Sequence, residues 1–122
     1  MTDLPTTTTE ILALLREKRF LELIGQFESS SLECKSKPYD FSRDSSKAEL
    51  AKDVSGFANA GGGLLLLGYK AETKEHYAED EVVDFRPIPV AKVDIGQIRS
   101  ILHAWLYPSS SSAEVHLFDA DL

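Results

Sequence analysis

One stretch, residues 47–69, limits what this chain can fold into more than any other. Its first part carries apolar side chains at i, i+4 and i+7, the stripe of an amphipathic helix: Leu50, Val54 and Phe57. Ser46, followed three residues later by Glu49, has the spacing of a capping box that starts a helix. The stretch therefore predicts a helix that begins near Ser46 and buries one face.

Glycines and leucines complete this stretch. Residues 61–63 are all glycine, which takes the left-handed conformation that ends helices at little cost. Residues 64–67 are all leucine and are bounded by Gly63 and Gly68. A short apolar run without alternation is typical of a strand buried on both faces. We therefore expect a glycine turn and then a buried strand.

Two helical segments and one strand are predicted before this stretch. Thr7 and Glu10 form a second capping-box pattern, which predicts a helix to about Lys18, and a shorter helix is expected over 20–26. Residues 31–36 alternate between two faces, as a strand does: Leu32 and Cys34 on one, Glu33 and Lys35 on the other.

After the leucines, residues 70–84 read as an acidic, irregular segment, with a small strand or packing point as an alternative at Val82, Val83 and Phe85. Asp94 with Gln97 then caps a last helix, whose predicted core stripe is Ile98, Ile101, Leu102 and Trp105. The alternation over 114–119 predicts a final strand.

The element order predicts an α/β (α+β) fold, a small mixed sheet flanked by helices, with a parallel first crossover. We divide the chain into an N-terminal lead and helix, residues 1–19, and one domain, residues 20–122. Three predicted strands are few for such a sheet. We therefore expect the domain to be truncated at its C-terminus, as a fragment or module of something larger.

Composition narrows the function classes. The 122 residues carry a net charge of −7, which argues against a protein that coats nucleic acid without specificity. No run of about 18 apolar residues and no signal-peptide pattern is present, so we expect no membrane segment. The single cysteine, Cys34, allows no disulfide within the chain and no cysteine zinc site, so a cytoplasmic location is expected.

Three segments together resemble the Schlafen AlbA-type domain, a divergent AlbA-like module described as a putative DNA-binding domain. Residues 28–35, ESSSLECK, resemble its entry strand with two glutamates and a lysine. Residues 56–62, GFANAGG, resemble its A-F-A-N-x-x-G-G segment, and residues 64–69 its apolar strand. The resemblance covers about residues 20–70 in matching order and spacing.

The resemblance implies two activities. In bacteria such modules are described as nucleic-acid-binding regulators, and in animal Schlafens a pair of them forms an endoribonuclease cleft with three carboxylates. Glu28 and Glu33 match the first two carboxylates, whereas the expected aspartate after the apolar strand is absent and Glu72 is the neighbouring substitute.

Carboxylates and a lysine are the residue types that metal-dependent cleavage of nucleic acid requires. Glu28, Glu33 and Glu72 would be the ligands of Mg²⁺ or Mn²⁺ in a nuclease, with Lys35 stabilising phosphate charge. Lys35 lies on the same strand face as Glu33, so a surface ion pair is the simpler interpretation of these two.

Basic residues gather between the predicted first strand and the helix. Those expected to contact phosphates are Lys35, Lys37, Arg43 and Lys47. Asn59, Gly61 and Gly62 could offer amides to a phosphate, although a helix cap is the commoner use of such a segment.

Our leading hypothesis is a nucleic-acid-binding module of a regulator, with DNA or RNA as partner, acting as a homodimer or beside further domains of a longer chain. The alternatives are a metal-dependent endoribonuclease that uses Glu28 and Glu33, and a protein-interaction or assembly domain without nucleic-acid binding, which the acidic balance favours.

Overall fold

A computed structural model describes residues 7–59, 61–106 and 113–120 of the chain; the first six residues of the predicted N-terminal lead lie outside these ranges. The elements follow in the order α1 (Thr8–Arg16), η1 (Phe20–Leu23), β1 (Leu32–Lys35), α2 (Asp44–Asn59), β2 (Leu64–Leu67), β3 (Tyr69–Thr73), β4 (Asp80–Phe85), η2 (Val90–Lys92) and α3 (Ile95–Trp105). Here η denotes a short 3₁₀ helix. None of the described helices is long and apolar enough to cross a bilayer.

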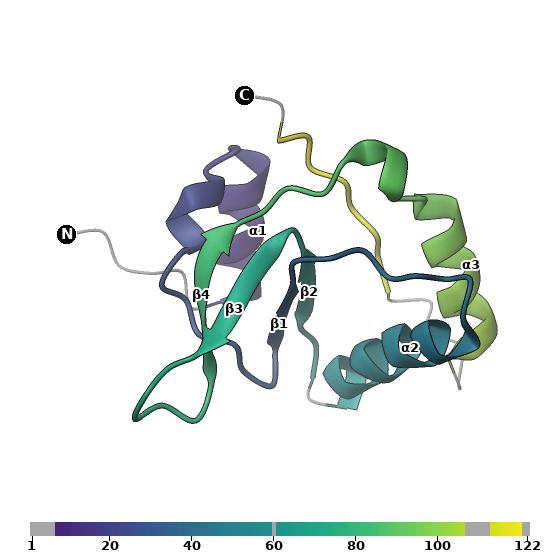
Figure 1. Cartoon of the computed structure of the whole chain (residues 1–122), viewed down its shortest axis with the longest axis horizontal. Helices are drawn as coiled ribbons and strands as arrows, with labels where there is room; N and C mark the ends of the chain where they lie inside the picture. The colour runs from purple at the N-terminus through teal and green to yellow at the C-terminus, as the bar shows by residue number, and fades with distance from the viewer. Residues whose placement is uncertain (1–6, 60, 107–112, 121–122) are drawn as a thin grey trace.

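The strands form two small ladders. β1 and β2 are parallel, in the register Leu32↔Leu64 to Lys35↔Leu67, so the predicted parallel crossover through a helix is confirmed. β3 and β4 form an antiparallel hairpin, which projects from the body of the molecule (Figure 1). Gly68 joins the two ladders, because its amide donates to the Lys35 carbonyl at 2.7 Å and its carbonyl accepts from the Arg86 amide at 2.7 Å.

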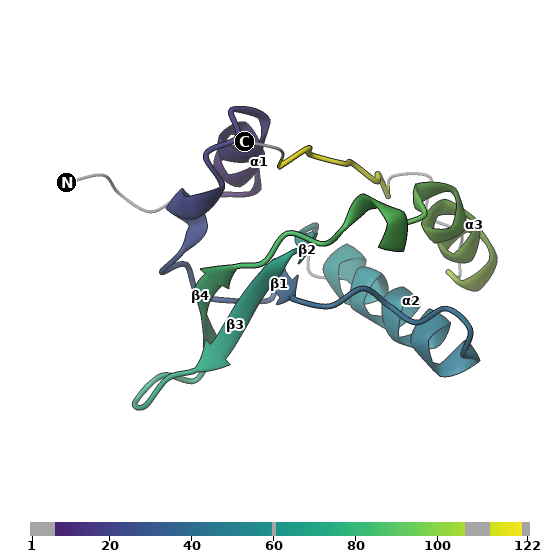
Figure 2. The ribbon, with the colours of Figure 1, turned by 45° about the horizontal axis from the view of Figure 1, so that its top comes forward.

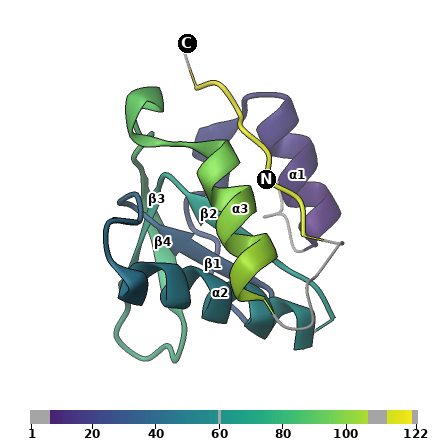
Figure 3. The ribbon, with the colours of Figure 1, turned by 90° about the vertical axis from the view of Figure 1, so that its right-hand side faces the viewer.

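Helices cover the β1–β2 pair on both faces, which confirms the predicted α+β class (Figures 1 and 2). On one face, α1 and η1 pack against Leu32, Cys34 and the hairpin residues Tyr69 and Val82. On the other face, α2 and α3 pack together, with Leu65 of β2 against them. α3 packs on α2, and Figure 3 shows these two helices crossing, with α1 to the right of α3 in that view. The strand pair is therefore the middle layer between two apolar cores.

An extended segment, residues 113–120, passes from the α3 side to the α1 side (Figure 2). Val115 packs against the α2–α3 core, whereas Phe118 and Ala120 pack against the α1 core. A groove of about 500 Å³ separates this segment from the leucines of β2. The predicted strand over 114–119 is therefore wrong for the described residues: the chain is extended there but joins no ladder.

The groove also bears on the prediction that the four leucines form a strand buried on both faces. All four leucines are half-buried, not fully buried, because within the described residues β2 is paired only with β1. Trp105 was predicted in the core stripe of α3, but it is 42 % exposed, whereas Ile98, Ile101 and Leu102 are buried as expected.

The segment predicted as irregular, residues 70–84, forms most of the β3–β4 hairpin, so that prediction is wrong, whereas the alternative of a small strand near Val82 and Phe85 is confirmed by β4. Tyr69 and Val82 are buried, and the Phe85 ring lies 5.0 Å from the Phe20 ring. The hairpin contains so many charged residues that its sequence suggests a loop, and these residues hide the strand pattern of its buried apolar side chains. The inner face of the hairpin nevertheless carries enough apolar area to pack against η1.

Most helix ends follow the predicted capping chemistry. Thr7 Oγ1 accepts from the Glu10 amide at 3.1 Å, and Asp94 Oδ1 accepts from the Gln97 amide at 3.0 Å. The helix predicted from Ser46 instead begins at Asp44, so that capping-box prediction is wrong. The helix predicted over 20–26 is shorter, a single 3₁₀ turn over Phe20–Leu23.

Gly63 occupies the tightest point between α2 and the strand pair. A Cβ at this position would lie 2.5 Å from Phe57 Cδ1 and 2.8 Å from the carbonyl oxygen of Ser31. We expect Gly63→Ala to lower the free energy of unfolding by about 1–3 kcal/mol, because backbone must move to admit the methyl group. Urea denaturation measures the change.

Gly56→Ala is the matched control, since Gly56 lies within α2 and a Cβ there meets nothing within 4 Å. Alanine in an open helical position should raise stability by up to about 1 kcal/mol. Equal effects of the two substitutions would contradict the packing described for Gly63.

Candidate functional site

The alternation of β1 sends its charged side chains toward α2. Leu32 and Cys34 are buried in the α1 core, and Glu33 and Lys35 are half-buried on the opposite face. The parallel pairing with β2 fixes this orientation, because a slip of one residue would exchange the two faces. The predicted placement of Glu33 and Lys35 on one face is therefore confirmed.

Three carboxylates surround the ammonium of Lys35. Its Nζ lies 3.1 Å from Glu49 Oε1, 3.6 Å from Glu33 Oε1 and 3.7 Å from Asp53 Oδ2. Glu49 and Asp53 are four residues apart on α2, so both lie on the helix face that meets β1. We call Glu33, Lys35, Tyr39, Glu49 and Asp53 the Lys35 cluster.

Tyr39, from the loop after β1, completes the Lys35 cluster. Its hydroxyl donates to Asp53 Oδ2 at 2.9 Å, and Lys35 Nζ lies 5.7 Å from the centre of its ring. Burial and the bond to Asp53 raise the pKa of Tyr39. Tyr39 therefore stays protonated and keeps Asp53 in place.

The cluster strengthens the charge of Lys35. Burial of the ammonium opposes ionisation, but the hydrogen bond to Glu49 and the charges of Asp53 and Glu33 outweigh it, so the pKa of Lys35 is raised. Lys35 is thus a fixed cation, and no neutral amine is available there as a base.

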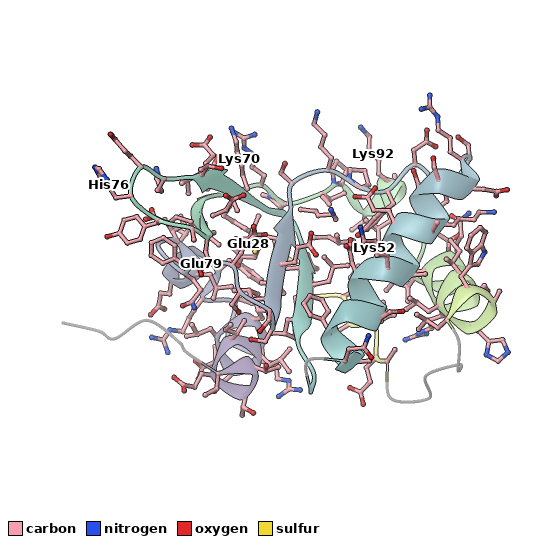
Figure 4. All side chains as sticks on the ribbon, turned by 90° about the horizontal axis from the view of Figure 1, so that it is seen from below. Glu28, Lys52, Lys70, His76, Glu79 and Lys92 are labelled. Carbon is pink, nitrogen blue, oxygen red and sulfur yellow. The ribbon has the colours of Figure 1, made fainter. Side chains whose placement is uncertain are left out.

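Glu28 lies beside β1 (Figure 4). Ser29 and Leu32 exchange backbone hydrogen bonds of 3.0 and 3.3 Å, and this turn folds Glu28 back. Its Oε2 then accepts from the Cys34 amide at 2.7 Å. Burial raises the pKa of Glu28; the bond from Cys34 opposes that rise, and the charges of Asp80 and Glu33 add to it.

Glu72 lies elsewhere, on β3. Its carboxylate is 2.7 Å from Lys70 Nζ, and this bond, with the charges of Lys74 and Arg86, lowers its pKa. In the described ranges, no group of three or more His, Cys, Asp or Glu side chains could hold a metal ion. The structure therefore does not assemble Glu28, Glu33 and Glu72 into the predicted set of Mg²⁺ or Mn²⁺ ligands, and the carboxylates nearest Lys35 are engaged with its ammonium.

The other predicted phosphate contacts lie on the connection between β1 and α2 and in the first turn of α2. Lys37 is exposed, Arg43 Nε is 3.8 Å from Asp40 and Lys47 Nζ is 3.7 Å from Asp44. With Lys35 they line the carboxyl end of β1 and the start of α2. Figure 4 shows a further lysine of α2, Lys52, projecting from the helix.

The predicted phosphate loop lies at the opposite end of α2. Gly61 and Gly62 have φ values of 90° and 120°, and their amides donate to the carbonyls of Ala58 and Phe57 at 3.3 and 2.7 Å. These amides therefore cap α2, the commoner interpretation of the segment. Asn59 ends the helix and is exposed, about 22 Å along the helix axis from Asp44.

Sequence reasoning missed Tyr39, Glu49 and Asp53 as members of this site. The signal for the two carboxylates was their i, i+4 spacing, off the apolar stripe of the predicted helix. Tyr39 carries no such signal, because the path of a loop after Pro38 does not follow from periodicity.

In comparisons with known proteins, one family model matches the part of the chain that contains the site. The model of a family described as Schlafen, AlbA_2 matches residues 28–99, which begin at Glu28 and include β1, the Lys35 cluster and the first part of α3, up to Arg99. No curated protein and no solved structure matches the chain.

Glu28→Gln should keep an oxygen for the Cys34 amide while removing a half-buried charge. We expect its free energy of unfolding at neutral pH to equal or exceed that of the unsubstituted protein. Because the pKa of Glu28 is raised on folding, its ionisation costs stability above its ordinary value of 4.5. The advantage of the glutamine should therefore grow as pH rises through that range and vanish below it, in urea titrations from roughly pH 4 to 8.

Glu28→Ala is the contrasting variant. It leaves the Cys34 amide without its carboxylate partner, and we expect a loss of about 1–3 kcal/mol. If the alanine variant were as stable as the glutamine variant, Glu28 would not hold the turn before β1.

Proposed function

The chain belongs to the Schlafen AlbA_2 family, and on that premise we propose that it is a nucleic-acid-binding module that contacts the phosphate backbone through the connection between β1 and α2. The contacts are Lys37 and Arg43 on the connection, together with Lys35 at the end of β1 and Lys47 at the start of α2, and the partner is DNA or RNA. The likeness to the family's nucleic-acid-binding regulators supports this function.

The observation that carries the proposal is the uneven charge of the chain. Residues 35–53 contain five basic and four acidic residues, a net charge of +1, within a chain of net charge −7. The structure places the basic residues of this segment on β1, the connecting loop and α2, where Lys37 is exposed and the Arg43 side chain is 76 % exposed. Exposed cations on one connection suit phosphates, which attract them at a distance.

The acidic remainder of the molecule limits the kind of binding. Negative charge outside the connection repels the polyanion, so only a defined surface can approach it. We therefore propose a local contact and not a coat along the strand. Dimerisation or neighbouring domains would add further contacts, as multivalent binding does.

Binding can be tested by fluorescence anisotropy with a labelled single-stranded RNA and a duplex DNA of about 20 nucleotides each. We expect Lys37→Ala with Arg43→Ala to weaken binding about tenfold at low salt, about 0.7 kcal/mol for each contact. The slope of log K against log salt should fall by about 0.7 per lost contact on RNA and about 0.9 on duplex DNA.

Arg16→Ala with Lys74→Ala is the charge-matched control, since Arg16 lies on α1 and Lys74 follows β3. This pair should change affinity little. Equal losses from both pairs would assign the effect to net charge, and absence of binding by the unsubstituted protein at low salt would refute the proposed function.

A further inference from the structure

Among the four proposed phosphate contacts, Lys35 is held differently from the others. Arg43 and Lys47 each have one acidic neighbour three residues away, at 3.8 and 3.7 Å. Lys35 instead has three carboxylates within 4 Å, one from its own strand and two from α2. Its side chain is only 24 % exposed. A phosphate that approaches Lys35 thus meets an ammonium whose positive charge is already more than balanced.

The three carboxylates differ in how firmly they are held. Asp53 is 15 % exposed and accepts the Tyr39 hydroxyl, so a second side chain fixes it. Glu33 is carried by β1 itself. Glu49 makes the shortest contact to the ammonium, yet its side chain is 54 % exposed, and within the described residues the only hydrogen bond of its carboxylate is the one from Lys35. Glu49 is therefore the most exposed of the three carboxylates, and water can solvate it when it leaves Lys35.

We propose that Glu49 masks Lys35: its carboxylate competes with phosphate for the ammonium and turns away when nucleic acid binds. This inference rests on the proposed function and adds how the site is regulated. Phosphate replaces the Glu49 carboxylate beside the ammonium, so Lys35 stays paired with an anion throughout. Asp53 and Tyr39 meanwhile keep the Lys35 side chain in place. Helix α2 thus sets how tightly the connection between β1 and α2 holds phosphate.

The first test measures the masking without nucleic acid. Reductive methylation with formaldehyde and a borohydride modifies exposed amines, and peptide mass spectrometry gives the rate at each lysine. We expect Lys35 to react at least about threefold more slowly than the exposed Lys37 and Lys92, and Glu49→Gln to speed its reaction about two- to fivefold. Equal rates at the three lysines in the unsubstituted protein would overturn the masking.

The second test is a double-substitution cycle in the RNA and DNA binding assay. Glu49→Gln should tighten binding about two- to fivefold, and this gain should disappear when Lys35→Gln is also present. Glu75→Gln is the matched control, because it removes the same charge from an 89 % exposed side chain whose ion-pair partner is His76. A gain that persists without Lys35, or that equals the effect of Glu75→Gln, would overturn the inference.

The two measurements separate this inference from the proposed function. If neither nucleic acid binds the unsubstituted protein, the proposed function fails and so does a competition with phosphate, even when methylation shows Lys35 covered. If nucleic acid binds and the cycle shows no coupling between Glu49 and Lys35, only the masking fails.

Discussion

The parallel pairing of β1 with β2 is the constraint on which the rest of the structure depends. Parallel neighbours cannot be joined by a tight turn, so the chain must cross over the sheet, and α2 is that crossover. The crossover brings the acidic face of α2 onto the charged face of β1. The Lys35 cluster is therefore a product of topology: its members come from residues 33 to 53, but only the return of the helix over the strand makes them neighbours.

Local patterns predicted much of this fold because their causes are local. The stripe of Leu50, Val54 and Phe57 predicted α2, and the conformational freedom of glycine predicted the cap that follows it at residues 61 and 62. The two capping sites at Thr7 and Asp94 are satisfied within three residues, so periodicity and side-chain chemistry suffice. The conformations of the β3–β4 hairpin and of the unpaired segment 113–120 depend on packing against parts of the chain that are distant in sequence. The residues next to each segment do not indicate that packing.

In the candidate site, too, the sequence predicted the charged residues but not their neighbours in space. The sequence predicted Lys35 as a phosphate contact and Glu72 as a metal ligand from their positions in a motif. In three dimensions Lys35 lies among carboxylates, and Glu72 lies near the cations Lys70, Lys74 and Arg86. Each group thus has neighbours of opposite sign that stabilise its charge. The charges around a residue come from every element that packs against it, whereas a sequence motif describes only the element on which the residue lies.

The groove beside β2 has a consequence for how this protein behaves at high concentration. In the part of the chain that the structure describes, the four leucines of β2 pair with β1 alone, and an unpaired strand edge is a template onto which another chain could add. Residues 113–120 line the groove with them and touch both cores, although they form no strand. Residues 113–120 therefore occupy part of the space that a strand added beside β2 would need.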